Sequence, residues 1–167
     1  PAVNFFTGKN GDTYAGMAQS SKEGYSYDKN SDKDRFDLVQ NIFTVRRDHK
    51  SNSAASDICL TNSGNNLICS NAGDNTATIY SVDKTTGKII TLNSLPVSGD
   101  YPKDLVIFPD NQHIAVANHS SNSITTFKVD YEKNIIMMKG KPRKIETPNC
   151  INIWPVPDGE DIEDIEA

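Results

Sequence analysis

The feature that most constrains the fold of this chain is an internal repeat. Residues 56–83 align with residues 103–130 without a gap, at a constant offset of 47 positions. A repeat of this length is typical of chains that stack copies of one supersecondary unit, so we expect several similar units rather than one closed core. The matching pairs include Asp57/Asp104, Asn71/Asn118, Asn75/Asn122, Thr78/Thr125, Leu67/Ile114 and Tyr80/Phe127.

Each unit is predicted to contain four β-strands. The apolar residues fall in short runs rich in Val, Ile, Thr, Tyr and Phe, and clusters of Gly, Asn, Asp and Ser separate these runs. This pattern is typical of β-strands separated by turns. Four strands per unit at this period predict the blades of a β-propeller. The predicted strands are 57–61, 67–71, 78–83 and 88–95 in the first unit, and 104–108, 114–118, 125–130 and 134–139 in the second.

Weaker copies of the unit flank the two strong ones. Upstream, the sequence predicts a turn over Lys9–Asp12, a strand over Thr13–Met17 and an outer strand over Phe36–Val45. Downstream, the chain aligns with the first strand of a unit and goes no further. The predicted fold class is all-β: a partial β-propeller over residues 1–157, with blades at about 1–47, 53–98 and 99–147 and a closing strand at 148–155.

These units are too few to close a propeller alone. Propellers typically have about four to eight blades, whereas this sequence supplies about three blades and one strand. A free arc of blades would leave two large apolar faces in contact with water. We therefore expect another chain, or a second copy of this chain, to close the ring.

The charge distribution limits the classes of partner. The net charge is -5, but six of the 22 acidic residues lie within 158–167, which leaves 16 acidic against 17 basic residues elsewhere. A nearly neutral body offers no basic face for nucleic acid, and no apolar run approaches the ~20 residues of a membrane helix. The segment 158–167 is predicted to be a disordered acidic tail. It lacks the spacing of a calcium loop, and we predict no metal site and no cofactor.

The predicted location of the protein is the cytoplasm. The chain has three cysteines, and an odd number forms no disulfide framework and suits a reducing compartment. No positively charged segment followed by an apolar core is visible after Pro1, so we expect no signal peptide.

Five segments of the chain resemble one propeller family. They are Ser56–Leu60, Asp83–Ile89, Gly99–Asp104, Ile114–Asn118 and Thr147–Ile151. They are similar to segments of the lactonase-type seven-bladed propellers, the family of bacterial 6-phosphogluconolactonase and of the fungal carboxymuconate lactonizing enzyme. The resemblance implies that this chain corresponds to the C-terminal half of a roughly doubled chain. It also implies a hydrolase that opens a sugar lactone in carbohydrate metabolism.

The blade geometry gathers polar residues of both strong units at one rim. Because strands one and two of a blade are antiparallel, the start of the first lies beside the end of the second, close to the central channel. Convergent polar groups at a channel mouth are the default binding site. The residues placed there are Ser56-Asp57 beside Asn71-Ala72, Lys103-Asp104 beside Asn118-His119, and Asn149-Cys150.

This rim departs from what the resemblance implies. The family carries Asn-Glu, Ile-His, Asn-Arg and Pro-Arg pairs at the rim. The family's acid and base candidates are therefore missing here. In place of its arginines, which bind anions through two N–H groups at once, this chain has a single lysine, which acts as a point charge. The corresponding residues of this chain are Ala18-Gln19, Ile58-Cys59, Asn71-Ala72 and Pro102-Lys103.

The remaining residues still define a candidate lactone hydrolase site. Lactone hydrolysis requires a base that activates water, a cation that holds an acidic substrate group, and donors for the developing oxyanion. We predict His119 as the catalytic base, with Asp104 as its orienting partner. We predict that Lys103 holds the anionic group of a small, acidic, sugar-lactone-like ligand. The other predicted substrate-binding residues are Asn118, Asn71, Asp57 and Asn149.

Most of these candidates also have a structural interpretation. Asp57 and Asp104 occupy equivalent positions of the two units, as do Asn71 and Asn118, and a catalytic residue rarely recurs in every blade. They are equally interpreted as caps of blade turns. Lys103 has a serine as its counterpart, which makes it the strongest functional candidate. Two other functions stay open: a non-catalytic propeller that binds a protein or a small acidic ligand, and a processed chain that completes a ring with a partner.

Overall fold

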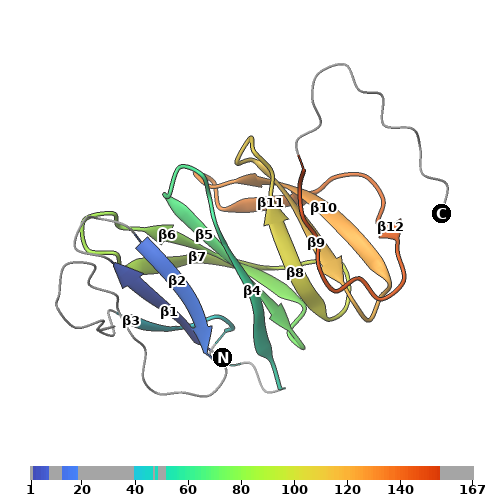
Figure 1. The fold of residues 1–167 in the computed structure, drawn as a ribbon, viewed down its shortest axis with the longest axis horizontal. Coiled ribbons are helices and arrows are strands. Elements are labelled where there is room, and N and C mark those ends of the chain that lie inside the picture. Colours follow the sequence, from blue (N-terminus) through green and yellow to red (C-terminus); the bar gives the residue numbers. More distant parts are fainter. Residues whose placement is uncertain (1, 8–12, 19–39, 47, 49–51, 155–167) are drawn as a thin grey trace.

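The computed structural model describes residues 2–7, 13–18, 40–46, 48 and 52–154 of the chain (Figure 1). This part contains strands and turns and no helix, which confirms the predicted all-β class. The predicted turn at Lys9–Asp12, the position Gln19 and the segment 158–167 lie outside the described residues. The strands are β1 (Ala2–Thr7), β2 (Thr13–Ala18), β3 (Gln40–Phe43), β4 (Ala54–Leu60), β5 (Asn66–Ala72), β6 (Thr76–Val82), β7 (Ile89–Pro96), β8 (Pro102–Ile107), β9 (His113–Asn118), β10 (Ser123–Asp130), β11 (Ile135–Met138) and β12 (Arg143–Lys144).

Two antiparallel sheets correspond to the two strong units of the repeat. The first has the strand order β4-β5-β6-β7 and the second the order β11-β10-β9-β8, so each is a meander in which consecutive strands pair. The short β12 adds to the second sheet by pairing with the start of β10. Every strand predicted in these units is present, with its ends within three residues of the prediction. The structure thus confirms two consecutive four-stranded blades of a partial propeller.

The repeat extends to single hydrogen bonds in the turns. Asn75 and Asn122 occupy the same place, between the second and third strands of their blades, with φ of 58° and 50°. Asn tolerates this left-handed backbone better than most residues, which explains its presence in both turns. The carbonyl of Asn75 accepts a hydrogen bond from Val97 N at 3.0 Å, and that of Asn122 accepts one from Ile145 N at 3.1 Å. The same contact therefore ties the segment after each fourth strand to its own blade.

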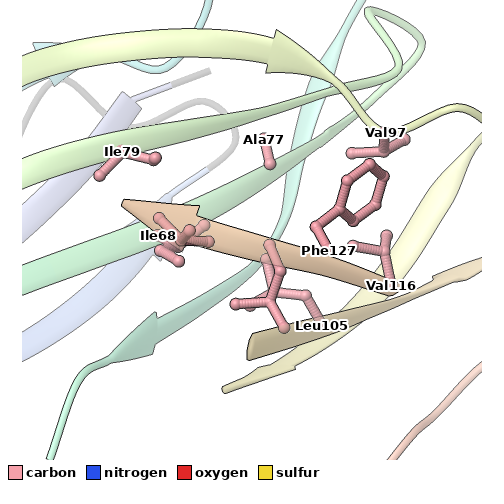
Figure 2. Close-up of a cluster of buried hydrophobic side chains, with 9 residues drawn as sticks. Ile68, Ala77, Ile79, Val97, Leu105, Val116 and Phe127 are labelled. Atoms are coloured by element: carbon pink, nitrogen blue, oxygen red, sulfur yellow. The ribbon is translucent and has the colours of Figure 1, made fainter. Parts of the chain in front are cut away.

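The hydrophobic core lies between sheets rather than inside one. On one face of the β4–β7 sheet, Ile68 and Ile79 pack against Val116 and Phe127 of the neighbouring sheet (Figure 2). The opposite face of the same sheet buries a second cluster, which includes Tyr80. A sheet covered on both faces reads as a run of buried residues instead of an alternation, and β5 shows this pattern. The burial is the reason that single blades must stack.

The N-terminal sheet differs from the two others. It has three strands in the order β2-β1-β3, so β1 lies in the middle. Strands are present near the predicted segments Thr13–Met17 and Phe36–Val45. The second of these, observed as β3, lies at an edge, but its partner is β1. Ile42 of β3 packs against the second core cluster, which joins this sheet to the β4–β7 sheet.

The segment after β12 runs alongside the last blade. Ile151 N donates a hydrogen bond to the Asp104 carboxylate at 2.8 Å, so residue 151 lies next to β8. Within the described part of the chain, residues 148–154 form no strand, and the closing role of 148–155 stays a prediction. No helix of the described residues has the length and apolarity required to cross a membrane. The cytoplasmic location also stays a prediction.

Candidate functional site

Two β-bulges at equivalent positions shape the candidate site. The strands β4 and β8 contact each other, and each begins at the same rim (Figure 1). The pairing of β4 with β5 shifts register between Ala55 and Asp57, and the pairing of β8 with β9 shifts between Pro102 and Asp104. The extra residues are Ser56 and Lys103. A bulge leaves its extra residue unpaired and re-aims its side chain, and this rim carries one in each strong blade.

The register confirms which residues the rim brings together. Ala55 pairs with Asn71 across β4 and β5, so Ser56 and Asp57 lie beside the end of β5. Pro102 pairs with Asn118 across β8 and β9, so Lys103 and Asp104 lie beside the end of β9. The predicted neighbourhood of both pairs is therefore present in the fold.

The two bulge residues do different things. Ser56 Oγ lies 2.6 Å from the carbonyl oxygen of Pro102 and 2.8 Å from Ser70 Oγ, so it joins its blade to the next one. Lys103 at the equivalent position is exposed and makes no ion pair with another described residue. Its ammonium instead lies 5.8 Å from the centre of the Tyr101 ring. Where the first strong blade has an internal hydrogen bond, the second thus has an exposed cation.

Tyr101 links Lys103 to His119. Its backbone has a φ of 58°, which is unusual for a bulky residue and costs on the order of 1–3 kcal/mol. Tyr101 N donates to Asn75 Oδ1 at 2.8 Å, and its carbonyl accepts from His119 N at 3.0 Å. The Tyr101 and His119 rings are tilted at 59° with centroids 6.4 Å apart. We call Tyr101, Lys103 and His119 the Tyr101 cluster.

The imidazole of His119 is only partly exposed. Its Nδ1 is buried and has no hydrogen-bond partner within the described part of the chain. None of the hydrogen bonds between described residues joins His119 to Asp104, which instead accepts from Ile151 N. The pairing of His119 with Asp104 as base and orienting residue therefore stays a prediction.

Asp57 and Asp104 form a carboxyl pair between the two strong blades. One oxygen of Asp57 accepts a hydrogen bond from Leu105 N at 3.0 Å, and Asp104 binds Ile151 N in the following segment. Burial raises the pKa of Asp57, and a hydrogen bond with the Asp104 carboxyl raises it further. Each aspartate thus accepts a hydrogen bond from a backbone N–H of the next unit, although the N–H of Leu105 belongs to β8 and not to a blade turn. Their roles in binding and catalysis stay predictions.

The raised pKa of Asp57 predicts a pH-dependent stability. The stability that comes from protonated Asp57 is present below its ordinary pKa of 3.8 and is lost as the pH rises through the raised value. We therefore expect Asp57→Asn, which keeps an acceptor and has no charge, to unfold at higher urea concentration than the parent at pH 7. The difference should shrink as the pH falls toward 4.

Asp110 provides a control because its pKa is shifted in the opposite direction to that of Asp57. A hydrogen bond from the His113 side chain lowers the pKa of Asp110 to about 2, so its contribution is present above the unfolded value and lost in acid. Asp110→Asn should therefore unfold at lower urea concentration than the parent at neutral pH. If both variants shift stability in the same direction at pH 7, the assignment of the Asp57 shift is wrong.

Asn71 and Asn118 occupy equivalent buried positions, each with 0% exposed area. Asn71 Nδ2 donates to Thr78 Oγ1 at 3.2 Å, and Asn118 Nδ2 donates to Thr125 Oγ1 at 2.9 Å. These threonines in turn donate to the carbonyls of Thr44 and Val97 in the preceding segments, at 2.6 and 2.8 Å. The geometry favours a structural role for both asparagines, and their predicted contact with a substrate stays a prediction.

The cysteines of the rim are poor nucleophiles in this geometry. Burial raises the pKa of the Cys59 thiol to about 12, and the thiol donates to the Leu105 carbonyl at 3.2 Å. A hydrogen bond with Asp104 raises the pKa of Cys150, which is exposed beside the equally exposed Asn149. Both side chains therefore remain thiols at neutral pH. Because the thiolate is the reactive form of cysteine, neither side chain is a good nucleophile.

Two clefts lie between neighbouring sheets, and the first borders the rim through Thr44 and Thr78, to which Asn71 donates hydrogen bonds. One of about 450 Å³ is lined by Phe43, Thr44, Arg46 and Asn93, among others. Another of about 520 Å³ lies at the opposite ends of β4 and β8 and includes Asn65, Asn111 and Asp130. Neither contains a member of the Tyr101 cluster. The rim remains the candidate site because it places a cation, an imidazole and carboxyl groups on neighbouring inner strands.

The sequence interpretation did not single out Tyr101 or Gly99. Tyr101 has Ala54 as its counterpart 47 positions earlier, and this aromatic-for-alanine difference, two positions before the aligned repeat begins, was the available signal. Gly99 has no positive φ, but the position of a side chain there would overlap Asn118. A contact between a glycine and a residue 19 positions away leaves no local pattern.

The chain matches one family model and several individual proteins. The family described as "Lactonase, 7-bladed beta-propeller" matches residues 19–153. A 6-phosphogluconolactonase of Bacillus subtilis is 21% identical over 135 residues, which are 81% of this chain and 39% of that protein. A 6-phosphogluconolactonase of Formosa agariphila is 31% identical over 100 residues, which are 59% of this chain and 27% of that protein.

A solved structure shows the same arrangement of strands. The crystal structure of a protein from Lactobacillus plantarum matches with a TM-score of 0.74 at 21% identity, and the match covers 89% of this chain and 42% of that protein. The likeness supports the propeller fold. The chain spans 39% of the Bacillus relative and 27% of the Formosa relative, so it corresponds to a part of these proteins.

Proposed function

Because the chain belongs to the seven-bladed β-propeller lactonase family, we propose that it forms part of a propeller that hydrolyses a sugar lactone bearing a negative charge. The names of the Bacillus and Formosa relatives, both 6-phosphogluconolactonases, support this substrate class. A seven-bladed ring needs blades beyond those described here. Another chain, a second copy of this chain or a longer form of it would supply them.

The observation that carries the proposal is the exposed cation at the second bulge. Lys103 lies at the rim of the inner strands. Its counterpart in the preceding blade, Ser56, instead makes hydrogen bonds inside the protein. An exposed lysine with no carboxylate partner among the described residues suits an anionic substrate group, since an ammonium binds phosphate as a point charge. This lysine takes the place of the arginine that the family carries after its proline.

The reaction requires water and no redox cofactor. Water attacks the lactone carbonyl, the ring C–O bond breaks, and the products are a free hydroxyl and a carboxylate with release of one proton. In our proposal His119 accepts the proton of the attacking water. Its position at the end of β9, on the same rim as Lys103, supports this role.

Removal of the cation tests the proposal. In the assembled protein, Lys103→Met is expected to lower kcat/KM for a phosphorylated sugar δ-lactone by about 10- to 100-fold, which is the range for loss of a hydrogen bond to a charged group. The unphosphorylated lactone should be affected little. Initial rates should be measured by acid release, after subtraction of spontaneous hydrolysis.

Two further variants are the controls for this measurement. Lys103→Arg keeps the charge and should retain most of the activity. Lys141→Met removes an exposed lysine of the loop between β11 and β12 and should have no effect. Equal loss of activity toward the charged and the neutral lactone would remove the basis of the Lys103 assignment. Unchanged turnover in both Lys103 variants would have the same consequence.

A specific observation also favours binding without catalysis as a second function. Where the family carries a histidine, Cys59 donates its thiol to a backbone carbonyl and has a pKa of about 12. Where the family carries an arginine, Ala72 is buried. This alternative predicts saturable binding of a phosphorylated sugar acid with no turnover of its lactone above the spontaneous rate.

A further inference from the structure

We propose that Tyr101 is a positioning residue that sets the charge preference of the rim by holding the Lys103 ammonium. The inference rests on the proposed function, since it assigns Lys103 the task of binding an anionic substrate group. It assigns a role to a residue that lies outside the aligned repeat and outside the four residue pairs in which this chain differs from the family.

The first argument is the way the backbone presents the Tyr101 ring. The residue has a φ of 58° and is 44% exposed. Hydrogen bonds on both sides of its peptide unit, with Asn75 Oδ1 at 2.8 Å and His119 N at 3.0 Å, hold it in this conformation. A left-handed backbone is unfavourable for a tyrosine, and residues held in this way cluster at functional sites. The aromatic ring is therefore kept at the rim although the backbone of Tyr101 is strained.

The second argument is the position of the cation. Lys103 Nζ lies 5.8 Å from the centroid of the Tyr101 ring, within the distance at which an ammonium is attracted to an aromatic face. A lysine stem is flexible and samples many rotamers when nothing restrains it. No salt bridge of a described residue competes for this ammonium. The ring restricts the cation without neutralising its charge, which leaves it available to an anion.

The third argument comes from the preceding blade. The counterparts of Tyr101 and Lys103 are Ala54 and Ser56, 47 positions earlier. Ala54 pairs with Ala72 in the regular ladder, and Ser56 bonds to the next blade, so this blade folds without either an aromatic or a cation. Tyr101 and Lys103 therefore occur together in one blade and are both absent from the other. The blade architecture does not require the pair.

The expected consequence is a preference for charged over neutral lactones. A ring that holds Lys103 in place reduces the freedom that the lysine loses when it binds an anion, and so it lowers KM without acting on the bond that breaks. An exposed cation–π contact contributes an effect of about two- to fivefold. Tyr101 thus acts on substrate choice through Lys103 rather than by touching the reacting atoms.

The test compares Tyr101→Leu with Tyr101→Phe in the assembled protein. For a phosphorylated sugar δ-lactone, Tyr101→Leu is expected to raise KM about two- to fivefold with little change in kcat. Tyr101→Phe, which keeps the ring, should behave like the parent. KM for the unphosphorylated lactone should be the same in all three proteins. In a Lys103→Met background, Tyr101→Leu should have no further effect.

Tyr101→Gly tests whether misfolding explains the change in KM. Glycine accepts the positive φ at residue 101, so this variant removes the ring while it relieves the backbone. It should reproduce the KM of Tyr101→Leu without loss of stability. A larger KM for charged and neutral lactones alike, or an equal effect in the Lys103→Met background, would overturn the inference. A Tyr101→Phe variant that matches Tyr101→Leu would overturn it too, because the hydroxyl would then be responsible.

A binding measurement separates this inference from the proposed function. The dissociation constant of the phosphorylated sugar acid, the product of the reaction, should rise about two- to fivefold in Tyr101→Leu by calorimetry. A Tyr101-dependent affinity without lactone turnover would refute the hydrolase and support the inference. Turnover that depends on Lys103 but not on Tyr101 would support the hydrolase and refute the inference.

Discussion

Replacing Gly99 with alanine is expected to lower the free energy of unfolding by about 3 kcal/mol, the upper part of the range for overpacked sites. A Cβ atom at Gly99 would lie 2.4 Å from Cγ and 2.5 Å from Nδ2 of Asn118. Asn118 has 0% exposed area and cannot move aside without breaking its hydrogen bond to Thr125. The variant therefore combines a steric overlap with a buried amide that loses a partner.

Gly140→Ala is the matched control for this prediction. Gly140 has a φ of 70°, but a Cβ there meets nothing within 4 Å, so only backbone strain of about 1 kcal/mol is expected. Urea unfolding of the intact protein, followed by a tertiary probe, measures both variants. If Gly99→Ala is no less stable than Gly140→Ala, the close contact of Gly99 with Asn118 is not a feature of the folded protein.

Phe127→Ala is expected to cost about 3 to 5 kcal/mol of stability, as is usual when a buried phenylalanine is truncated. Phe127 is 3% exposed and belongs to the core cluster shared by the β4–β7 and β8–β11 sheets (Figure 2). The cavity would open between two blades rather than inside one. We therefore expect the variant to weaken the contact between blades as well as the blade itself.

Phe108→Ala tests whether the position or merely the residue type matters. Phe108 is half-buried and makes an edge contact with His113, with centroids 6.3 Å apart, outside that cluster. Its truncation should cost clearly less than that of Phe127 in the same urea titration. Similar losses in the two variants would contradict a core located between the sheets.

The strong blades were predictable because their signals are local. Turn residues separate short β-rich runs, and the constant offset of 47 residues lets each unit confirm the other. The N-terminal unit lacks such a close copy. There the sequence pattern located strands near Thr13–Met17 and within Phe36–Val45, but not that the second of them pairs with β1.

The site was predictable only in outline. Antiparallel pairing is a rule of geometry, so the neighbourhood of Lys103 and Asn118 followed from the strand assignment alone. Which of the rim side chains face outward did not follow. Asn118 and Lys103 lie on paired strands of one blade, yet the first is buried and hydrogen-bonded to Thr125 of the same blade, whereas the second is exposed.

The sequence by itself determined the repeating unit, its four strands and the resemblance to the lactonase propellers, because these depend on residue types at short and regular spacings. The tertiary structure alone decided how the units share their interfaces. The bulge that exposes Lys103, the contact of Gly99 with Asn118 and the hydrogen bond of Tyr101 with Asn75 all arise where segments that are separate in the sequence meet. Such contacts depend on three-dimensional distance, and a one-dimensional pattern carries no direct record of it.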